Sequence, residues 1–210
     1  MKNRRPLIYL SVAVLVVIAT FIVERPDDER ISDVSAKYLI DGYDSAKVAS
    51  FEVTQLMDGA QLRREGEGWA VAELASPARR ELLAAEGRYP PEANWVRAES
   101  VRVNSALGSF GGLEEGLFVS DNPEKQHEYR VDAAGVSVRG YDSDGNKLFD
   151  VIVGKSGPDF MGTYVRREGE NRVWLVNRPI VGAFSPRASD WEKREEKESP
   201  PEKPGQTPLE

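Results

Sequence analysis

The amino-acid sequence predicts an α+β domain: an antiparallel sheet of β-hairpins and meanders with one or two covering helices, preceded by a single N-terminal transmembrane helix. Three observations lead to this expectation. Residues 6–23 carry no charge, short alternating segments separated by glycine-containing turns fill much of the chain, and two stretches between residues 76 and 112 have helix signals. Strands this close together favour antiparallel hairpins, because parallel strands need a long crossover.

The uncharged stretch "PLIYLSVAVLVVIATFIV", residues 6–23, is long enough to span a membrane. A helix of this length covers ~27 Å at ~1.5 Å per residue, close to the ~30 Å of a bilayer core. A cleavable signal peptide is the competing interpretation, but it needs small residues before the cleavage site, where Phe21, Ile22 and Val23 stand. We therefore expect an uncleaved anchor.

The charges around this stretch predict its orientation. Residues 1–5 are basic, whereas Asp27, Asp28 and Glu29 follow the apolar run. Positive charge is retained on the cytoplasmic side, so the N-terminus is expected in the cytoplasm and the domain in the periplasm, on a single-pass protein of the inner (cytoplasmic) membrane.

The remaining chain divides into three parts. Residues 24–37 are charged and lack apolar periodicity, so they are expected to form a juxtamembrane linker. Residues 38–186 are expected to form the extracytoplasmic domain. Residues 187–210 are rich in charge and proline, a composition that cannot bury enough apolar surface to fold, and predict a disordered tail.

The domain is expected to begin with a meander and a surface helix. Residues 48–56 alternate as a strand, Asp58-Gly59 is a turn signal, and Gly66-Glu67-Gly68 marks a second turn before Trp69. Residues 76–87 have helix punctuation, with Ser76 as N-cap, Pro77 at the first position and Gly87 just past the end.

A second helix is predicted within residues 91–112. Residues on one face recur there at spacings of three and four, and we expect this largely apolar face to cover the sheet: Val96, Ser100, Val103, Leu107 and Phe110. Residues 113–126 are predicted as a loop. Strands then follow at 127–131, 135–141, 147–154, 162–168 and 172–177, each separated by a turn signal.

Composition excludes several classes of function. The chain has a formal net charge of −7, and an acidic surface repels the phosphates of nucleic acid. It contains no cysteine, which removes disulfides, thiolate metal sites and thiol nucleophiles.

The motif Gly154-Lys155-Ser156 resembles the end of a nucleotide-binding P-loop. That loop needs a glycine at position 149, where Phe149 stands, and a helix after the motif, where Gly157-Pro158 and a strand-like segment follow. We therefore predict a hairpin connection and no nucleotide site.

Two other patterns suggest chemistry only weakly. Residues 142–146 ("DSDGN") begin like a calcium loop. Such a loop needs a glycine at position 147 and a glutamate at position 153, but Lys147 and Val153 occupy these positions. His127 is the single histidine of the chain, placed at the start of a predicted strand, and zinc would need three further ligands without cysteine. We predict no catalytic, cofactor-binding or metal-binding residues.

Trp69, Trp95, Trp174 and Trp191 are expected mainly in the core or at its edges, although an aromatic-lined binding cleft stays an alternative.

The order of these segments resembles a known family. The stretches "YLIDGYDSAKVASFEVTQ", "AQLRREGEGWAV", "HEYRVDAAGVSVRGYDSDGNKLFDVIVGK" and "GTYVRREGENRVWLVN", closing on "SDWEKR", are similar to the bacterial envelope proteins of domain of unknown function 4340. The resemblance implies a membrane-anchored extracytoplasmic α+β domain, often encoded beside gliding-type ABC transporter subunits. It implies no catalytic residues.

We therefore expect a non-enzymatic accessory or scaffold domain on the periplasmic side of the inner membrane, partnered by an ABC transporter permease or another envelope protein. The alternatives are a binding module for an envelope glycan or lipid and, more remotely, a carboxylate-dependent hydrolase. Lys155, Arg166 and Arg167 are the candidate binding residues, since they are cations near one hairpin of an acidic chain.

Overall fold

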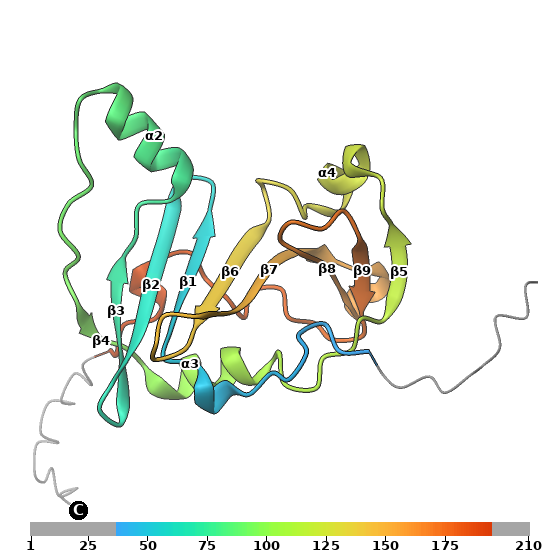
Figure 1. Ribbon diagram of the computed structural model, residues 1–210, viewed down its shortest axis with the longest axis horizontal. Coiled ribbons are helices and arrows are strands. Elements are labelled where there is room, and N and C mark those ends of the chain that lie inside the picture. The colour runs from blue at the N-terminus through green and yellow to red at the C-terminus, as the bar shows by residue number, and fades with distance from the viewer. Residues whose placement is uncertain (1–36, 195–210) are drawn as a thin grey trace, which may run out of the picture. The chain divides into compact units, whose positions relative to one another are not determined.

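The computed structural model describes residues 37–194, which form an α+β domain around an antiparallel sheet. Within this range the sheet has nine strands in the order β4-β3-β2-β1-β6-β7-β8-β9-β5. Figure 1 shows them crossing the picture from β4 on the left to β5 on the right, with α3 below the sheet. The α+β class and the antiparallel sheet are confirmed. The predicted anchor at 6–23, the linker up to residue 36 and the tail beyond residue 194 lie outside the described residues.

The strands are β1 Ser50–Gln55, β2 Asp58–Glu65, β3 Gly68–Glu73, β4 Val96–Arg97, β5 Leu117–Ser120, β6 Val136–Tyr141, β7 Lys147–Ser156, β8 Thr163–Arg167 and β9 Val173–Val176. The α-helices are α2 Pro77–Ala85, α3 Ser100–Gly108 and α4 Gln126–Tyr129, and the 3₁₀ turns are η1 Ser45–Lys47, η2 Pro123–Lys125, η3 Pro158–Phe160 and η4 Ala188–Asp190.

The main core lies on one face of the sheet. In β1, Phe51 and Val53 are buried while their neighbours Ser50, Glu52 and Thr54 are partly exposed, as expected when successive side chains of a strand point to opposite faces. Val53 pairs with Val138 of β6, which in turn pairs with Val151 of β7, so a row of valines crosses the central strands. The predicted covering helix α3 closes this core with Val103, Ala106 and Leu107.

The first hairpin turn lies two residues before its predicted place. Gln55 pairs with Asp58, so Leu56 and Met57 form the turn, and Leu56 takes a positive φ of 47°. Gly59 lies inside β2, where a Cβ atom would collide with the carbonyl oxygen of Leu74. This glycine therefore permits a close backbone approach and does not form the turn.

The second helix is shorter than its sequence periodicity predicted. Only residues 100–108 are helical, and Val96 belongs to β4 instead. The N–H of Ala98 donates to the carbonyl of Trp69 at 2.8 Å, and Val96 pairs with Val71 of β3. Pairing with a distant strand therefore overrides the helical spacing of the apolar residues. The helix α2, in contrast, has the predicted Ser76 cap, which accepts from the N–H of Arg79.

Two further predictions were wrong. The predicted strand at 127–131 begins in the one-turn helix α4, which ends at Arg130 with a left-handed φ of 56°. The predicted loop at 113–126 contains the edge strand β5, which pairs with β9. Both elements are four residues long, so neither the helical nor the strand spacing of apolar residues can identify them from the sequence.

The domain also extends beyond its predicted end at residue 186. Trp191 is 0% exposed in the main core, and its backbone carbonyl accepts from the N–H of Glu99 at 2.7 Å. The N–H of Lys193 donates to the carbonyl of Arg97 at 2.9 Å. Residues 187–194 are thus part of the fold, because one tryptophan buries enough apolar surface to hold an otherwise polar segment.

Candidate functional site

A groove lined by four cations is the most distinctive surface feature of the described residues. It has a volume of about 670 Å³ and lies between the ends of β6 and β7 and the segment 181–190. We name it the cationic groove and define it by Arg102, Arg130, Lys155 and Arg187. One carboxylate, Asp190, also lines it.

The cations come from four separate elements. Lys155 lies near the end of β7, with its Nζ 6.0 Å and 5.8 Å from the ring centroids of Tyr129 and Tyr164. Arg130 is the left-handed residue that ends α4. Both side chains are exposed, and neither forms an ion pair with another residue of the described chain.

The other two cations lie beside the C-terminal segment. The guanidinium of Arg102, on α3, lies 5.4 Å from the ring centroid of Trp191. Arg187 precedes η4, and its Nε is 3.5 Å from Oδ2 of Asp190. The groove thus gathers four positive charges against one negative charge on a chain whose net charge is −7. Such a local excess attracts anionic groups to this part of the surface.

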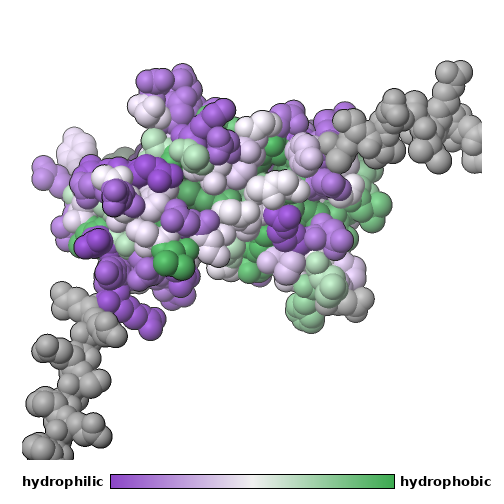
Figure 2. Space-filling view, turned by 90° about the horizontal axis from the view of Figure 1, so that it is seen from below, coloured by the Kyte–Doolittle hydropathy of each residue, from purple (hydrophilic) through white to green (hydrophobic). Residues whose placement is uncertain are grey.

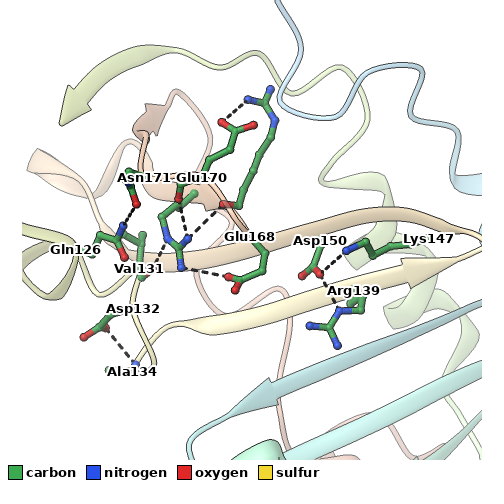
Figure 3. A network of polar contacts seen from close by, with 12 residues as sticks. Gln126, Val131, Asp132, Ala134, Arg139, Lys147, Asp150, Glu168, Glu170 and Asn171 are labelled. Atoms are coloured by element: carbon green, nitrogen blue, oxygen red, sulfur yellow. Dashed lines mark hydrogen bonds and ion pairs between the residues drawn. The ribbon is translucent and has the colours of Figure 1, made fainter. Parts of the chain in front are cut away.

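Of the three predicted binding residues, Lys155 alone lies in the groove. Arg166 is 8% exposed on β8, and its Nε donates to the carbonyl of Val131 at 2.8 Å. Its other nitrogens donate to the carbonyl of Glu170 at 2.8 Å and to the carboxylate of Glu168 at 3.2 Å. Val131, Glu168 and Glu170 are labelled around this guanidinium in Figure 3. Arg166 is therefore a structural residue.

Arg167 is also engaged within the fold. Its Nε donates to the carbonyl of Leu39 at 2.7 Å, and one terminal nitrogen donates to the carbonyl of Tyr38 at 3.0 Å and to the carboxylate of Glu115 at 2.6 Å. Glu115 is buried and also lies 3.3 Å from Lys37. Arg167 therefore ties the start of the domain to β8.

The Gly154-Lys155-Ser156 motif belongs to the predicted hairpin but lies in its first strand, and the connection itself is formed by residues 157–162. All three residues continue β7, and a Cβ atom at Gly154 would collide with the carbonyl oxygen of Tyr129. The short η3 turn and β8 follow. In the described chain no helix starts at this motif to present N–H groups to a phosphate.

The Asp142–Asn146 stretch is a hairpin turn between β6 and β7. Oδ1 of Asp142 accepts from the backbone N–H groups of Asp144 and Asn146 at 2.9 Å and 2.8 Å. Hydrogen bonds from the side chain and then the backbone of Asn146 hold the pKa of Asp142 below its usual range. The carboxylate is thus used by the turn itself.

His127 and the tryptophans do not converge on a site. The histidine is exposed on α4, with Nδ1 2.7 Å from the carbonyl oxygen of Glu124. Trp69 and Trp191 are buried, and Trp95 lies under the guanidinium of Arg63 at 4.1 Å. Trp174 packs against Phe118 with ring centroids 5.6 Å apart. None of the four lines the cationic groove.

The face of the sheet opposite the main core carries a charged network. Arg139 of β6 donates to Oδ2 of Asp150 at 2.8 Å, and Lys147 lies 3.1 Å from the same carboxylate oxygen (Figure 3). Arg139 also lies 3.5 Å from Glu52. The hydrogen bond to Asp150 is the main reason why the pKa of Arg139 is raised. A hollow of about 380 Å³ on this face is lined by both signs of charge, so it lacks the excess of positive charge found in the cationic groove.

Sequence reasoning identified Lys155 and missed Arg102, Arg130 and Arg187. These three residues lie in separate segments with no shared motif or period. Their clustering follows from the packing of α3, α4 and residues 181–190 around the end of β7.

Comparison with known proteins gives one match. A family model described as a domain of unknown function (DUF4340) matches residues 88–203. No curated protein and no solved structure matches. Among the residues that the structure describes, no helix has the length and apolar character needed to cross a membrane.

Proposed function

We propose that this chain, which belongs to the family of the domain of unknown function DUF4340, is a non-enzymatic, membrane-anchored accessory domain that binds an envelope protein through its cationic groove. Residues 6–23 form the anchor in this proposal, so that the domain faces the periplasm. The partner is an ABC transporter permease or another envelope protein with an acidic segment.

The cationic groove is the observation that carries this proposal. Lys155 and Arg130 form no ion pair with any carboxylate whose side chain the structure describes, and both are exposed to an incoming anionic surface. Opposite charge on a partner speeds association and selects among partners. Arginine and aromatic residues are frequent in protein interfaces, and Phe160 and Phe184 line this groove beside its arginines.

Charge reversal in the groove is expected to release the partner. The double variant Lys155→Glu/Arg130→Glu changes four cations against one acid into two cations against three acids. We expect recovery of the partner with the full chain, purified in mild detergent, to fall by at least about tenfold, or about 1.4 kcal/mol of binding free energy.

Lys47→Glu is the control, because Lys47 is exposed and does not line the groove. Lys47 lies in η1, before the start of β1, whereas the groove is reached by Gln55 at the other end of β1. Its recovery of the partner should equal that of the unchanged chain. An equal loss in both variants, or no loss in the double variant, would contradict a role for the groove. Circular dichroism of each variant checks that the fold is kept.

A further inference from the structure

The loop between β7 and β8 exposes two large apolar side chains. In residues 157–162, Phe160 is 81% exposed and Met161 is 68% exposed. On the face shown in Figure 2, hydrophobic residues form separate patches between hydrophilic ones. Adjacent apolar side chains at a loop tip form a candidate interaction site where other features of the surface support it.

The loop is held in this shape from its base. The N–H of Gly157 donates to the carbonyl of Gly162 at 2.8 Å, which closes the loop. A Cβ atom at Gly157 would lie 2.6 Å from Cδ1 of Leu175, and one at Gly162 would lie 2.6 Å from the carbonyl oxygen of Val176. Both glycines therefore allow the base of the loop to pack tightly on β9.

The backbone at the tip is strained. Phe160 has a φ of 59°, a left-handed conformation that is unfavourable for a bulky residue. Strain of this kind persists where the surrounding structure enforces it, and it is frequent at binding sites. The backbone conformation of the loop therefore holds Phe160 in its exposed position.

Cations lie beside this apolar tip. Phe160 lines the cationic groove together with Lys155, Arg130 and Arg102. The loop sequence itself contains one acid, Asp159, which the groove cations outnumber. Exposed apolar side chains flanked by Lys and Arg are typical of surfaces that enter the headgroup region of anionic bilayers.

The length of the connecting chain favours a bilayer as the occupant. The thirteen residues 24–36 separate the proposed anchor from the domain. Even fully extended, at roughly 3.5 Å per residue, they span only about 45 Å. The domain therefore stays close to the membrane surface, and a protruding tip can enter lipid headgroups without a complementary pocket.

We propose that loop 157–162 is a second membrane contact, in which Phe160 and Met161 enter the headgroup region of an anionic phospholipid surface beside the cationic groove. This inference rests on the anchor of the proposed function. It orients the cationic groove toward the membrane, where a membrane-embedded partner presents its acidic segments.

The absence of native cysteine allows a direct test. Met161→Cys carries a single environment-sensitive fluorophore, and Tyr89→Cys, at a residue that is 90% exposed, provides the matched control. Each full-length variant is reconstituted into vesicles of phosphatidylcholine and phosphatidylglycerol that contain a nitroxide-labelled lipid. We expect a blue shift and quenching by the lipid at position 161 and neither at position 89.

A label at position 161 that the lipid nitroxide does not quench, in a chain that floats with the vesicles, overturns the membrane contact and leaves the proposed function intact. Protection of that label from aqueous iodide without lipid quenching also overturns it and indicates a protein contact. A chain that does not float with vesicles overturns the anchor, and the loop inference with it.

A second variant separates membrane contact from loss of folding. Phe160→Gly removes the apolar tip and tolerates the positive φ, so the unfolding midpoint should stay the same or rise. Introduced into the Met161→Cys chain, it should reduce the lipid quenching. Unchanged quenching would contradict the assigned role of Phe160.

Discussion

Replacing Trp191 by alanine is expected to destabilise the domain by about 3–5 kcal/mol, the range observed when a buried tryptophan is truncated. Trp191 is 0% exposed, and its ring packs edge-on against Phe51 with centroids 5.9 Å apart. Its Nε1 donates to the carbonyl of Ser185 at 2.8 Å, so the truncation leaves both a cavity and an unpaired acceptor. Chemical denaturation followed by circular dichroism measures this loss.

Two comparisons sharpen the Trp191 prediction. Tyr89→Ala removes a ring that is 90% exposed and should change stability by less than about 0.5 kcal/mol. Trp191→Phe keeps an apolar ring and loses the hydrogen bond, so its effect should fall between the two. A change at Trp191→Ala as small as that at Tyr89→Ala would show that residues 187–194 do not belong to the folded domain.

Replacing Arg167 by alanine is expected to cost about 3 kcal/mol, because it removes the nearer cation from a buried carboxylate and breaks two hydrogen bonds to backbone carbonyl groups. The variant loses the hydrogen bonds to the carbonyls of Leu39 and Tyr38 and leaves the buried carboxylate of Glu115 with Lys37 as its remaining cation. Urea unfolding gives the magnitude. Hydrogen exchange at residues 38–40 should rise at the same time, since Arg167 ties that segment to β8.

The conservative variant Arg167→Lys should lose most of the same stability. A single ammonium group has no planar fork that reaches two carbonyl groups and a carboxylate together. Arg172→Ala, at an exposed arginine before β9, is the matched control and should be close to neutral. Equal effects of Arg167→Ala and Arg172→Ala would contradict the structural role of Arg167.

The sequence predicted the elements that have a local cause. The hairpins from β6 to β9 were found because alternating apolar residues are separated by glycine-containing turns, such as Asp144-Gly145 with its positive φ at Gly145. The helix α2 was found from its Ser76 cap and Pro77.

The missed elements depend on contacts between distant segments. The two-residue strand β4 forms because β3 and residues 191–193 bond its backbone on either side. The helix α4 and strand β5 are short, and residues 187–194 are polar apart from Ala188 and Trp191. The secondary-structure propensity and the spacing of apolar residues carry little information about such short segments. Their structure is decided by one buried aromatic ring or by backbone hydrogen bonds to a distant strand.

The candidate site shows the same limit. Lys155, Arg166 and Arg167 are close in sequence, but Arg166 and Arg167 are neighbours on one strand, and successive side chains of a strand point to opposite faces. The alternation of a strand therefore already predicts that these two arginines lie on opposite faces of the sheet. The residues that join Lys155 come from α3, α4 and the segment before η4, which no spacing in the sequence brings together.

Site-specific photo-crosslinking tests the central claim, that the cationic groove contacts a partner protein, most directly. A photoreactive amino acid replaces Val181, which lines the groove and is exposed, or the fully accessible Tyr89 as reference, and intact membranes are irradiated. A discrete crosslinked product from position 181, absent from position 89 and lost in the Lys155→Glu/Arg130→Glu background, is the result predicted here. The same products from both positions, or a product at position 181 that survives the charge reversal, would contradict the claim.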